Sequence, residues 1–139
     1  MDGVINKLRF KGQKRVSVIN ASDHYLNLFK EWLPDVKIDT CIDQRFLYEF
    51  MVVFSENSAD VKRLAPPVLH NLAADGVLWF VYPKKTGKQK KSDIDRDHGW
   101  EPLQEKGFRG VSQISVDESL SALRFRNETY IRSARKPAV

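Results

Sequence analysis

The sequence predicts an α/β fold in which a mainly parallel sheet is closed by an antiparallel hairpin. Short β-branched apolar runs alternate with segments of helical periodicity, an order that requires right-handed crossovers between parallel strands. Two alternating runs, residues 111–116 and 120–126, then flank the acidic turn "DES", a pattern typical of a hairpin. We therefore expect a three-layer Rossmann-like sandwich.

The first half of the chain carries three of the expected strands and one helix. Residues 15–21, "RVSVINA", predict the first strand, and the following "SD" is a helix start signal. Apolar residues of "HYLNLFKEWL" recur at helical spacing up to Pro34. Residues 36–42 and 48–55 predict the next two strands, and the second of these is apolar almost throughout, as is typical of strands covered on both faces.

The second half begins with a helix for which Ser58 is the candidate N-cap. Pro66 and Pro67 predict a break or a fresh start within it, because proline lacks the amide that a helix interior needs. Residues 77–83 predict a fourth buried strand. One or two short helices are expected within residues 93–107, before the hairpin.

Composition favours one domain spanning residues 1–139, with residues 1–13 and 127–139 as loosely docked ends. The chain is 42% hydrophobic and 29% charged, which is ordinary for a soluble globular protein. No apolar stretch approaches the roughly 20 residues that span a bilayer, and no secretory signal is recognisable. Cys41 has no second cysteine as a partner and is expected to pack on a strand. These features favour the cytoplasm and leave the oligomeric state open.

The net charge of +5 is concentrated at the two ends of the chain and in one loop. Residues 1–16 hold five basic residues and one acid, residues 124–136 hold the same balance, and residues 84–109 hold eight basic residues and five acids. Such basic segments attract polyanions through the release of phosphate counterions. A solvated surface without a partner is the alternative interpretation.

Three separated segments carry a resemblance to known proteins. They are "VSVINASDHYLNLF", "LAADGVLWFVYPKKTGKQKKSDIDRDHGW" and "VSQISVDESLSALRFR". Over residues 14–126 they resemble a family of small bacterial proteins of unknown function in which an "LW…YPKK" strand end, a "D…RD" segment and a "VDE.WSALRF" hairpin recur. More distantly, the order of elements and the approach Asp75-Gly76-Val77-Leu78 resemble S-adenosylmethionine-dependent methyltransferases. The first resemblance implies a fold without an activity, and the second implies an S-adenosylmethionine cofactor.

The first turn departs from the pattern that the methyltransferase resemblance implies. A Rossmann cofactor site needs glycines directly after the first strand and an acid about 20 positions later for the ribose hydroxyls. The turn reads "NASDHY" and contains no glycine, whereas Asp39 or Asp43 could fill the ribose role. Because its glycine motif is absent, the cofactor stays unknown. Helix amides at this turn favour a small anionic or polar ligand over an adenosine.

A ligand site is expected beyond the carboxyl ends of the parallel strands, where open α/β sheets bind their ligands. Arg96, which follows in the next segment, could also reach an anion held there. The candidate ligand-binding residues are Asn20, Ser22, Asp23, His24, Ser55, Asn57, Lys84, Lys85 and Arg96.

The segment "DIDRDHG", residues 93–99, has two interpretations. Its carboxylates could hold a hard cation, or they could cap a helix and pair locally with Arg96. The spacing differs from a calcium loop and neighbouring cations repel a metal ion, so we expect no metal. His98 could act as a general base and Trp100 as a stacking surface. No partner nucleophile has a recognisable spacing, so catalytic residues stay unknown.

Three functions are compatible with these features. The main expectation is a non-catalytic Rossmann-like module that binds a small anionic or nucleotide-like ligand. The first alternative is a degenerate or divergent S-adenosylmethionine-dependent methyltransferase. The second is a protein that binds nucleic acid or an acidic protein through its basic tails and loop, although no motif of a nucleic-acid-binding fold is present. No membrane partner is expected.

Overall fold

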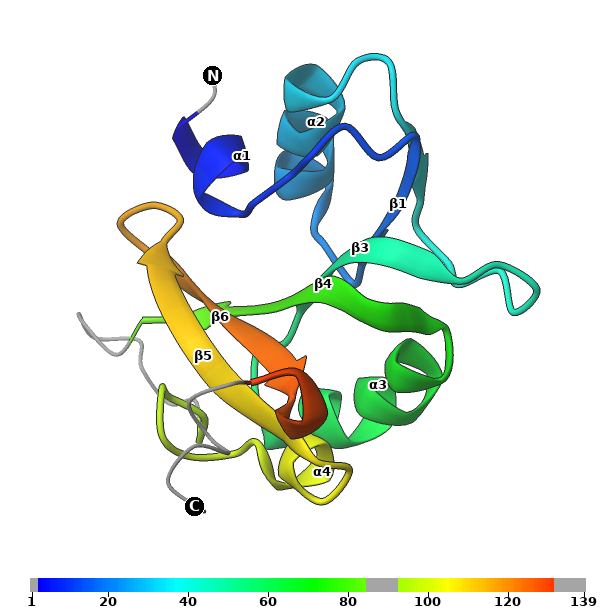
Figure 1. The fold of residues 1–139 in the computed structure, drawn as a ribbon. Coiled ribbons are helices and arrows are strands. Elements are labelled where there is room, and N and C mark those ends of the chain that lie inside the picture. The colour runs from blue at the N-terminus through cyan, green and yellow to red at the C-terminus, as the bar shows by residue number, and fades with distance from the viewer. Residues whose placement is uncertain (1–2, 85–92, 132–139) are drawn as a thin grey trace.

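The computed structural model describes residues 3–84 and 93–131, which form a six-stranded sheet with the order β2-β1-β3-β4-β6-β5 (Figure 1). The strands β1 to β4 run parallel to one another, and β6 is antiparallel to both β4 and β5. This arrangement confirms the predicted mainly parallel sheet with a C-terminal hairpin. The strands are β1 (Arg15–Ile19), β2 (Lys37–Asp39), β3 (Tyr48–Phe54), β4 (Leu72–Pro83), β5 (Phe108–Ser115) and β6 (Leu120–Asn127).

Helices cover both faces of the sheet, as expected for a three-layer sandwich (Figure 1). One core, between the sheet and the first two helices, contains Phe29, Phe50 and Trp79. The other, on the opposite face, contains Leu64 and Phe80. No helix in the described part of the chain is long and apolar enough to cross a membrane. The helices are α1 (Gly3–Lys7), α2 (Asp23–Trp32), α3 (Ser58–His70) and α4 (Glu101–Gln104), and a 3-10 turn (Glu128–Tyr130) follows β6.

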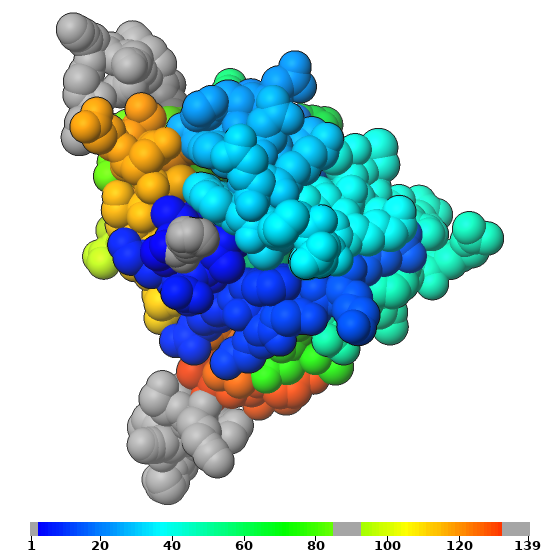
Figure 2. Space-filling model, turned by 90° about the horizontal axis from the view of Figure 1, so that it is seen from above, coloured from blue at the N-terminus to red at the C-terminus, as the bar shows by residue number. Residues whose placement is uncertain are grey.

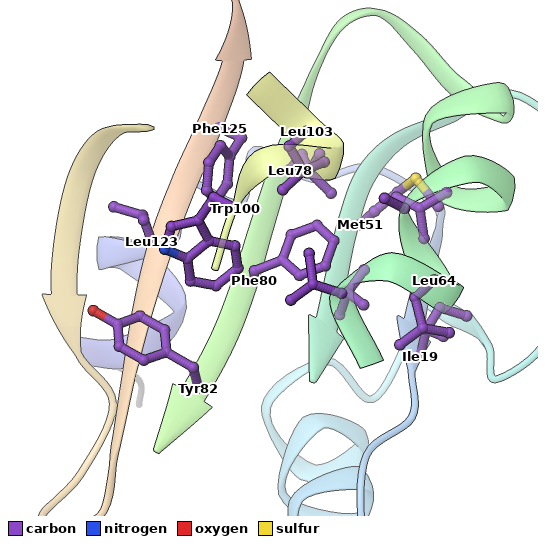
Figure 3. Close-up of a cluster of buried hydrophobic side chains, with 14 of the residues drawn as sticks. Ile19, Met51, Leu64, Leu78, Phe80, Tyr82, Trp100, Leu103, Leu123 and Phe125 are labelled. Carbon is purple, nitrogen blue, oxygen red and sulfur yellow. The ribbon is translucent and has the colours of Figure 1, made fainter. Parts of the chain in front are cut away.

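Trp100 fills the second core beneath the hairpin (Figure 3). Its ring centroid lies 5.8 Å from that of Phe80, 5.5 Å from that of Tyr82 and 5.1 Å from that of Phe125. Its indole Nε1 donates to the carbonyl oxygen of Asp95 at 2.7 Å. The backbone before Trp100 is therefore irregular, and only the short α4 forms where one or two helices were expected within residues 93–107.

A loose end was expected at residues 1–13, but its described part docks on the sheet from residue 3 to residue 10. Ile5 and Leu8 are buried, and the carbonyl oxygen of Leu8 accepts a hydrogen bond from Trp79 Nε1 at 2.9 Å. Their apolar side chains cover the α2 face of the sheet, and the indole satisfies a buried backbone acceptor. At the other end, residues 132–139 lie outside the described residues.

Two boundary predictions in the first half of the sheet are wrong. The strand expected over residues 36–42 ends at Asp39, because that side chain binds groups on β1 and β3 and the chain then turns back across the sheet. Cys41 is consequently exposed in this turn and does not pack on a strand.

The helix α3 continues through Pro66 and Pro67 where a break was expected. Both prolines are exposed, as are Lys62 and Arg63, whose carbonyl oxygens lose their helical donors. Those oxygens face solvent, which can satisfy them, so the helix is not interrupted. Its N-cap is Asn57, not Ser58.

Candidate functional site

The crevice expected to bind a ligand lies between β1 and β3, because β1 has β2 on one side and β3 on the other. Asn20 follows β1 directly, and its Nδ2 donates to the carbonyl oxygen of Phe54, the last residue of β3, at 2.9 Å. Asn20 has a φ of 63°, in the left-handed region that glycine occupies most easily and asparagine tolerates. The backbone therefore turns as a glycine turn would, but a side chain links the two strand ends.

Asp39, one of the two acids considered for a ribose contact, belongs to an internal network. Its side chain is 8% exposed and binds Arg15, with Nε and Nη2 at 2.8 and 2.7 Å. The Tyr48 hydroxyl donates to the same carboxylate, and Lys37 Nζ lies 3.3 Å from its other oxygen. Burial alone would raise the pKa of Asp39, but these donors outweigh burial and hold the pKa below its usual value.

Asp43, the other acid considered, binds the same arginine. Its Oδ2 accepts from Arg15 Nη2 at 3.0 Å, and its Oδ1 accepts from the backbone amide of Arg45 at 3.0 Å. The backbone hydrogen bond and the arginine hold the pKa of Asp43 below its usual value. The Arg15 guanidinium also lies 4.3 Å from the ring centroid of Phe46. Asp39 and Asp43 therefore both neutralise the charge of Arg15.

The N-terminus of α3, at the same edge, receives a carboxylate from elsewhere in the chain. Asp93 accepts from the backbone amide of Ser58 at 2.7 Å and from its hydroxyl at 2.5 Å. Asn57 caps the helix by accepting from the amide of Asp60 at 3.0 Å. A helix N-terminus favours negative charge, so Asp93 takes the place that a ligand anion would take there.

Lys84 and the hairpin turn form a second set of internal contacts at this edge. Lys84 Nζ donates to Ser115 Oγ at 2.8 Å and to the carbonyl oxygen of Asp117 at 2.7 Å. The Tyr25 hydroxyl of α2 donates to Asp117 Oδ2 at 2.5 Å. Burial and this carboxylate raise the pKa of Tyr25 to about 12. These contacts tie α2, the end of β4 and the hairpin together.

Four of the remaining predicted ligand residues lie at the carboxyl edge of the sheet, and the other two are Arg96 and Lys85. Ser22 caps α2 as predicted and is exposed, as are Asp23 and His24. Ser55 follows β3 at the same edge, but it is buried and its hydroxyl has no hydrogen-bond partner. Arg96 is exposed and lies 3.5 Å from Asp97. Lys85 lies outside the described residues.

The residues after Asp93 form a capped turn. Asp95 Oδ1 accepts from the backbone amides of Asp97 and His98, each at 2.9 Å, and lies 2.8 Å from His98 Nδ1. The expectation that Asp93 or Asp95 caps the next helix is wrong, because α4 begins after Trp100 without a side-chain cap, Asp93 binds the start of the preceding helix α3, and Asp95 binds its own turn. The expected local ion pair of Arg96 is present, with Asp97. Within residues 3–84 and 93–131 no group of histidines, cysteines and acids is arranged to hold a metal ion.

Arg96 lines a cavity that the sequence did not indicate. The cavity measures about 370 Å³ and lies between the segment around Trp100 and the β5–β6 hairpin. Trp100, Leu123 and Phe125 provide apolar lining, and Gln113 provides polar lining. Its position depends on how the segment before β5 crosses the hairpin, which local periodicity does not determine.

Comparison with solved structures identifies the fold. The chain is 12% identical to a ribosomal protein L11 methylase from Lactobacillus delbrueckii subsp. bulgaricus, with a TM-score of 0.57 over 89% of this chain and 74% of that one. It is also 12% identical to a phosphoethanolamine N-methyltransferase from Haemonchus contortus in complex with S-adenosylhomocysteine, with a TM-score of 0.56 over 88% of this chain and 37% of that one. The pyocyanin biosynthetic protein PhzM is 10% identical, with a TM-score of 0.59 over 89% of this chain and 53% of that one.

These similarities show a methyltransferase-like Rossmann fold, as the distant resemblance in the sequence implied. No protein-family model matches the chain, and no curated protein matches its sequence. The resemblance to a family of small bacterial proteins therefore stays a prediction.

Proposed function

We propose that this chain is a degenerate methyltransferase-fold module, in which the chain's own side chains occupy the edge where an adenosyl cofactor would bind. The observation that carries the proposal is the Asn20 amide, which joins the ends of β1 and β3 by a hydrogen bond of 2.9 Å to Phe54. Close approach of cofactor to backbone at this turn requires the absence of a side chain.

The acid position supports the same proposal. A ribose binds through hydroxyls that need a free carboxylate oxygen as acceptor. The Asp39 carboxylate binds Arg15, Tyr48 and Lys37. A ribose that displaced Arg15 would leave its guanidinium with one carboxylate fewer, which is unfavourable. The residues present therefore do not fit an S-adenosylmethionine cofactor.

A divergent methyltransferase is the second candidate function. The left-handed φ of Asn20 keeps the turn that a cofactor-binding glycine would form, and one structure with a similar fold holds S-adenosylhomocysteine. The expected small anionic or nucleotide-like ligand is a third candidate. It would bind near the exposed Ser22 and His24 at the start of α2, since Asp93 already occupies the start of α3.

Isothermal titration of the full chain with S-adenosylhomocysteine, adenosine monophosphate and inorganic phosphate tests these candidates. For the degenerate module we expect a dissociation constant for S-adenosylhomocysteine no tighter than about 1 mM, a binding free energy of about 4 kcal/mol. Binding below about 100 µM that is weakened tenfold by Asp39→Asn but not by Asp35→Asn would contradict the module and support a divergent enzyme. Phosphate or nucleotide binding that His24→Ala abolishes would instead support the small ligand.

A further inference from the structure

Three arginines, Arg9, Arg124 and Arg126, interact on the face formed by α1 and β6, and two of them form no ion pair in the described part of the chain. Arg126 forms a bidentate ion pair with Asp75, with both hydrogen bonds at 2.8 Å. The two remaining arginines, Arg9 and Arg124, form no ion pair among the residues described.

The fold brings these two arginines together from opposite ends of the chain. Arg124 pairs with Trp79 in the β4–β6 ladder, and the Trp79 indole donates to the carbonyl oxygen of Leu8. Arg9 follows Leu8 directly, so its backbone lies beside the strand that carries Arg124. In Figure 2 the blue N-terminal segment borders the orange-red residues of β6.

The environment of Arg124 leaves a hydrogen-bond donor unsatisfied. The side chain is partly buried, and its Nε is buried without a hydrogen-bond partner. Burial, followed by the positive charges of Arg9 and Arg126, lowers the pKa of Arg124. A buried donor without an acceptor is unfavourable, and more so in a charged group. An anion beside the accessible part of the guanidinium would offset the repulsion from the two neighbouring arginines.

Arg9 stands where the backbone favours glycine. It has a φ of 64° and ends α1, where the amide of Phe10 donates to the carbonyl oxygen of Ile5 at 3.4 Å and the amide of Arg9 donates to that of Asn6 at 3.0 Å. Glycine adopts this conformation without strain, whereas residues with a Cβ are strained in it. The chain thus holds a guanidinium at a position that is unfavourable for its backbone.

We propose that Arg9 and Arg124 bind a phosphate of a nucleic-acid backbone on the face formed by α1 and β6. A guanidinium can donate two parallel hydrogen bonds to one phosphate, and arginine is the residue best suited to this geometry. This site shares no residue with the carboxyl edge of the sheet, so a test of one proposal does not decide the other.

The exposed cations of the N-terminal segment favour a polymer over a small phosphate compound. Arg9 is exposed, and Lys7, Lys11 and Lys14 are exposed along the same N-terminal segment. Such a row of cations matches the repeating phosphates of a nucleic acid, which release counterions on binding. No base-reading motif accompanies the cations, so binding is expected to be independent of sequence.

The test is fluorescence anisotropy of a labelled single-stranded oligonucleotide of about 20 nucleotides with the full-length chain at about 50 to 200 mM salt. The double variant Arg9→Gly with Arg124→Met removes both guanidinium groups, fits the left-handed backbone and keeps apolar packing. The matched control, Lys62→Ala with Lys106→Ala, removes two exposed charges on the opposite face. Circular dichroism checks that each variant folds.

We expect the double variant to bind at least about tenfold more weakly and the control less than about threefold. The slope of log affinity against log salt should fall by about 0.7 in the double variant, because one phosphate contact is lost and each such contact on a single strand contributes about 0.7. Equal losses in variant and control, or no binding at the lowest salt, would overturn the site. Tighter binding to phosphatidylserine vesicles than to the oligonucleotide, lost in the double variant, would overturn the assignment to nucleic acid.

Discussion

At the carboxyl edge of the sheet, Asn20, Asp93 and Lys84 each bind another part of the chain, whereas on the α1 and β6 face Arg9 and Arg124 have no acidic partner among the described residues. The first region is the one where an open α/β fold binds its ligand. The second is outside the positions that the fold predicts for a site. Charged and amide side chains are therefore paired at the edge where the fold predicts a ligand, although the buried Ser55 hydroxyl there has no partner, and two arginines form no ion pair where the fold predicts no site.

The contrast suggests how polar groups that stabilise the fold can be told apart from polar groups that are available to an outside partner. A polar side chain with an internal partner contributes to folding, and its removal lowers stability. A cation without a partner contributes little or is unfavourable, and its removal lowers only the binding of an outside partner. Stability measurements on matched variants therefore test the comparison directly.

The largest expected effect is at Trp79, which holds α1 against β6 and so positions Arg9. Its side chain is fully buried and donates to the carbonyl oxygen of Leu8. We expect Trp79→Ala to lower the free energy of unfolding by about 3 to 5 kcal/mol in urea denaturation. Trp79→Phe, which keeps a ring but loses the donor, should lower it by about 1 to 3 kcal/mol. A loss below about 1 kcal/mol for the alanine variant would contradict the docking of α1.

The next effect is at Asp39, the acid in the Arg15 network. Asp39→Asn removes a charge from a partly buried ion pair and should lower the free energy of unfolding by about 2 to 3 kcal/mol at pH 7. Asp35→Asn, in the exposed turn after α2, should change it by less than about 0.5 kcal/mol. If the two variants change the free energy of unfolding equally, the ion pair of Asp39 with Arg15 does not stabilise the fold, and Asp39 could accept a hydrogen bond from a ribose.

The same network gives a pH dependence whose sign follows from its lowered pKa. Because the folded pKa of Asp39 lies below its unfolded value of about 4, its contribution is complete above that value and is lost as the pH falls through the folded pKa. Urea denaturation between about pH 5 and 2 should therefore show a shallower loss of stability for Asp39→Asn than for the unaltered chain. Parallel curves would contradict the network.

A smaller effect is expected at Tyr25, which joins α2 to the hairpin turn through Asp117. Tyr25→Phe removes one hydrogen bond to a charged group and should lower the free energy of unfolding by about 1 to 2 kcal/mol. Tyr130→Phe, at a tyrosine that is 39% exposed, is the matched control and should have almost no effect. If the two variants lose the same amount of stability, the hydrogen bond between Tyr25 and Asp117 does not stabilise the carboxyl edge of the sheet.

The fold was predictable because its main signals are local. The apolar run of β3, the capped start of α2 at Ser22 and the acidic turn of the hairpin each determine an element without distant contacts. The boundaries that were wrong depend on distant partners. The strand β2 stops at Asp39 because Arg15 and Tyr48 bind it, and Leu8 docks because Trp79 donates to its carbonyl oxygen.

The position of the candidate ligand residues at one edge of the sheet was predictable from the sequence, whereas the contacts that they make were not. Strand order places Asn20, Ser55 and Lys84 at one edge, and the missing glycine was visible in the sequence. Asn20 adopts a left-handed φ, and its side chain binds the carbonyl oxygen of Phe54. No local pattern in the sequence indicates this contact, because Phe54 is distant along the chain. The approach of Arg9 to Arg124 likewise joins the two basic ends of the chain, and only the excess of charge at each end pointed to it.

The smallest expected effect, and the one of opposite sign, is at Arg9. Arg9→Gly relieves a left-handed φ of 64° and removes a cation near Arg124, although glycine also makes the unfolded chain more flexible. We expect a net gain of about 0.5 to 1 kcal/mol in urea denaturation. Arg9→Ala removes the same charge but keeps the strain, so it should gain less than the glycine variant. A loss of stability with Arg9→Gly would mean that the guanidinium has a partner within the protein. Arg9 would then stabilise the fold, as Asn20, Asp93 and Lys84 do at the carboxyl edge.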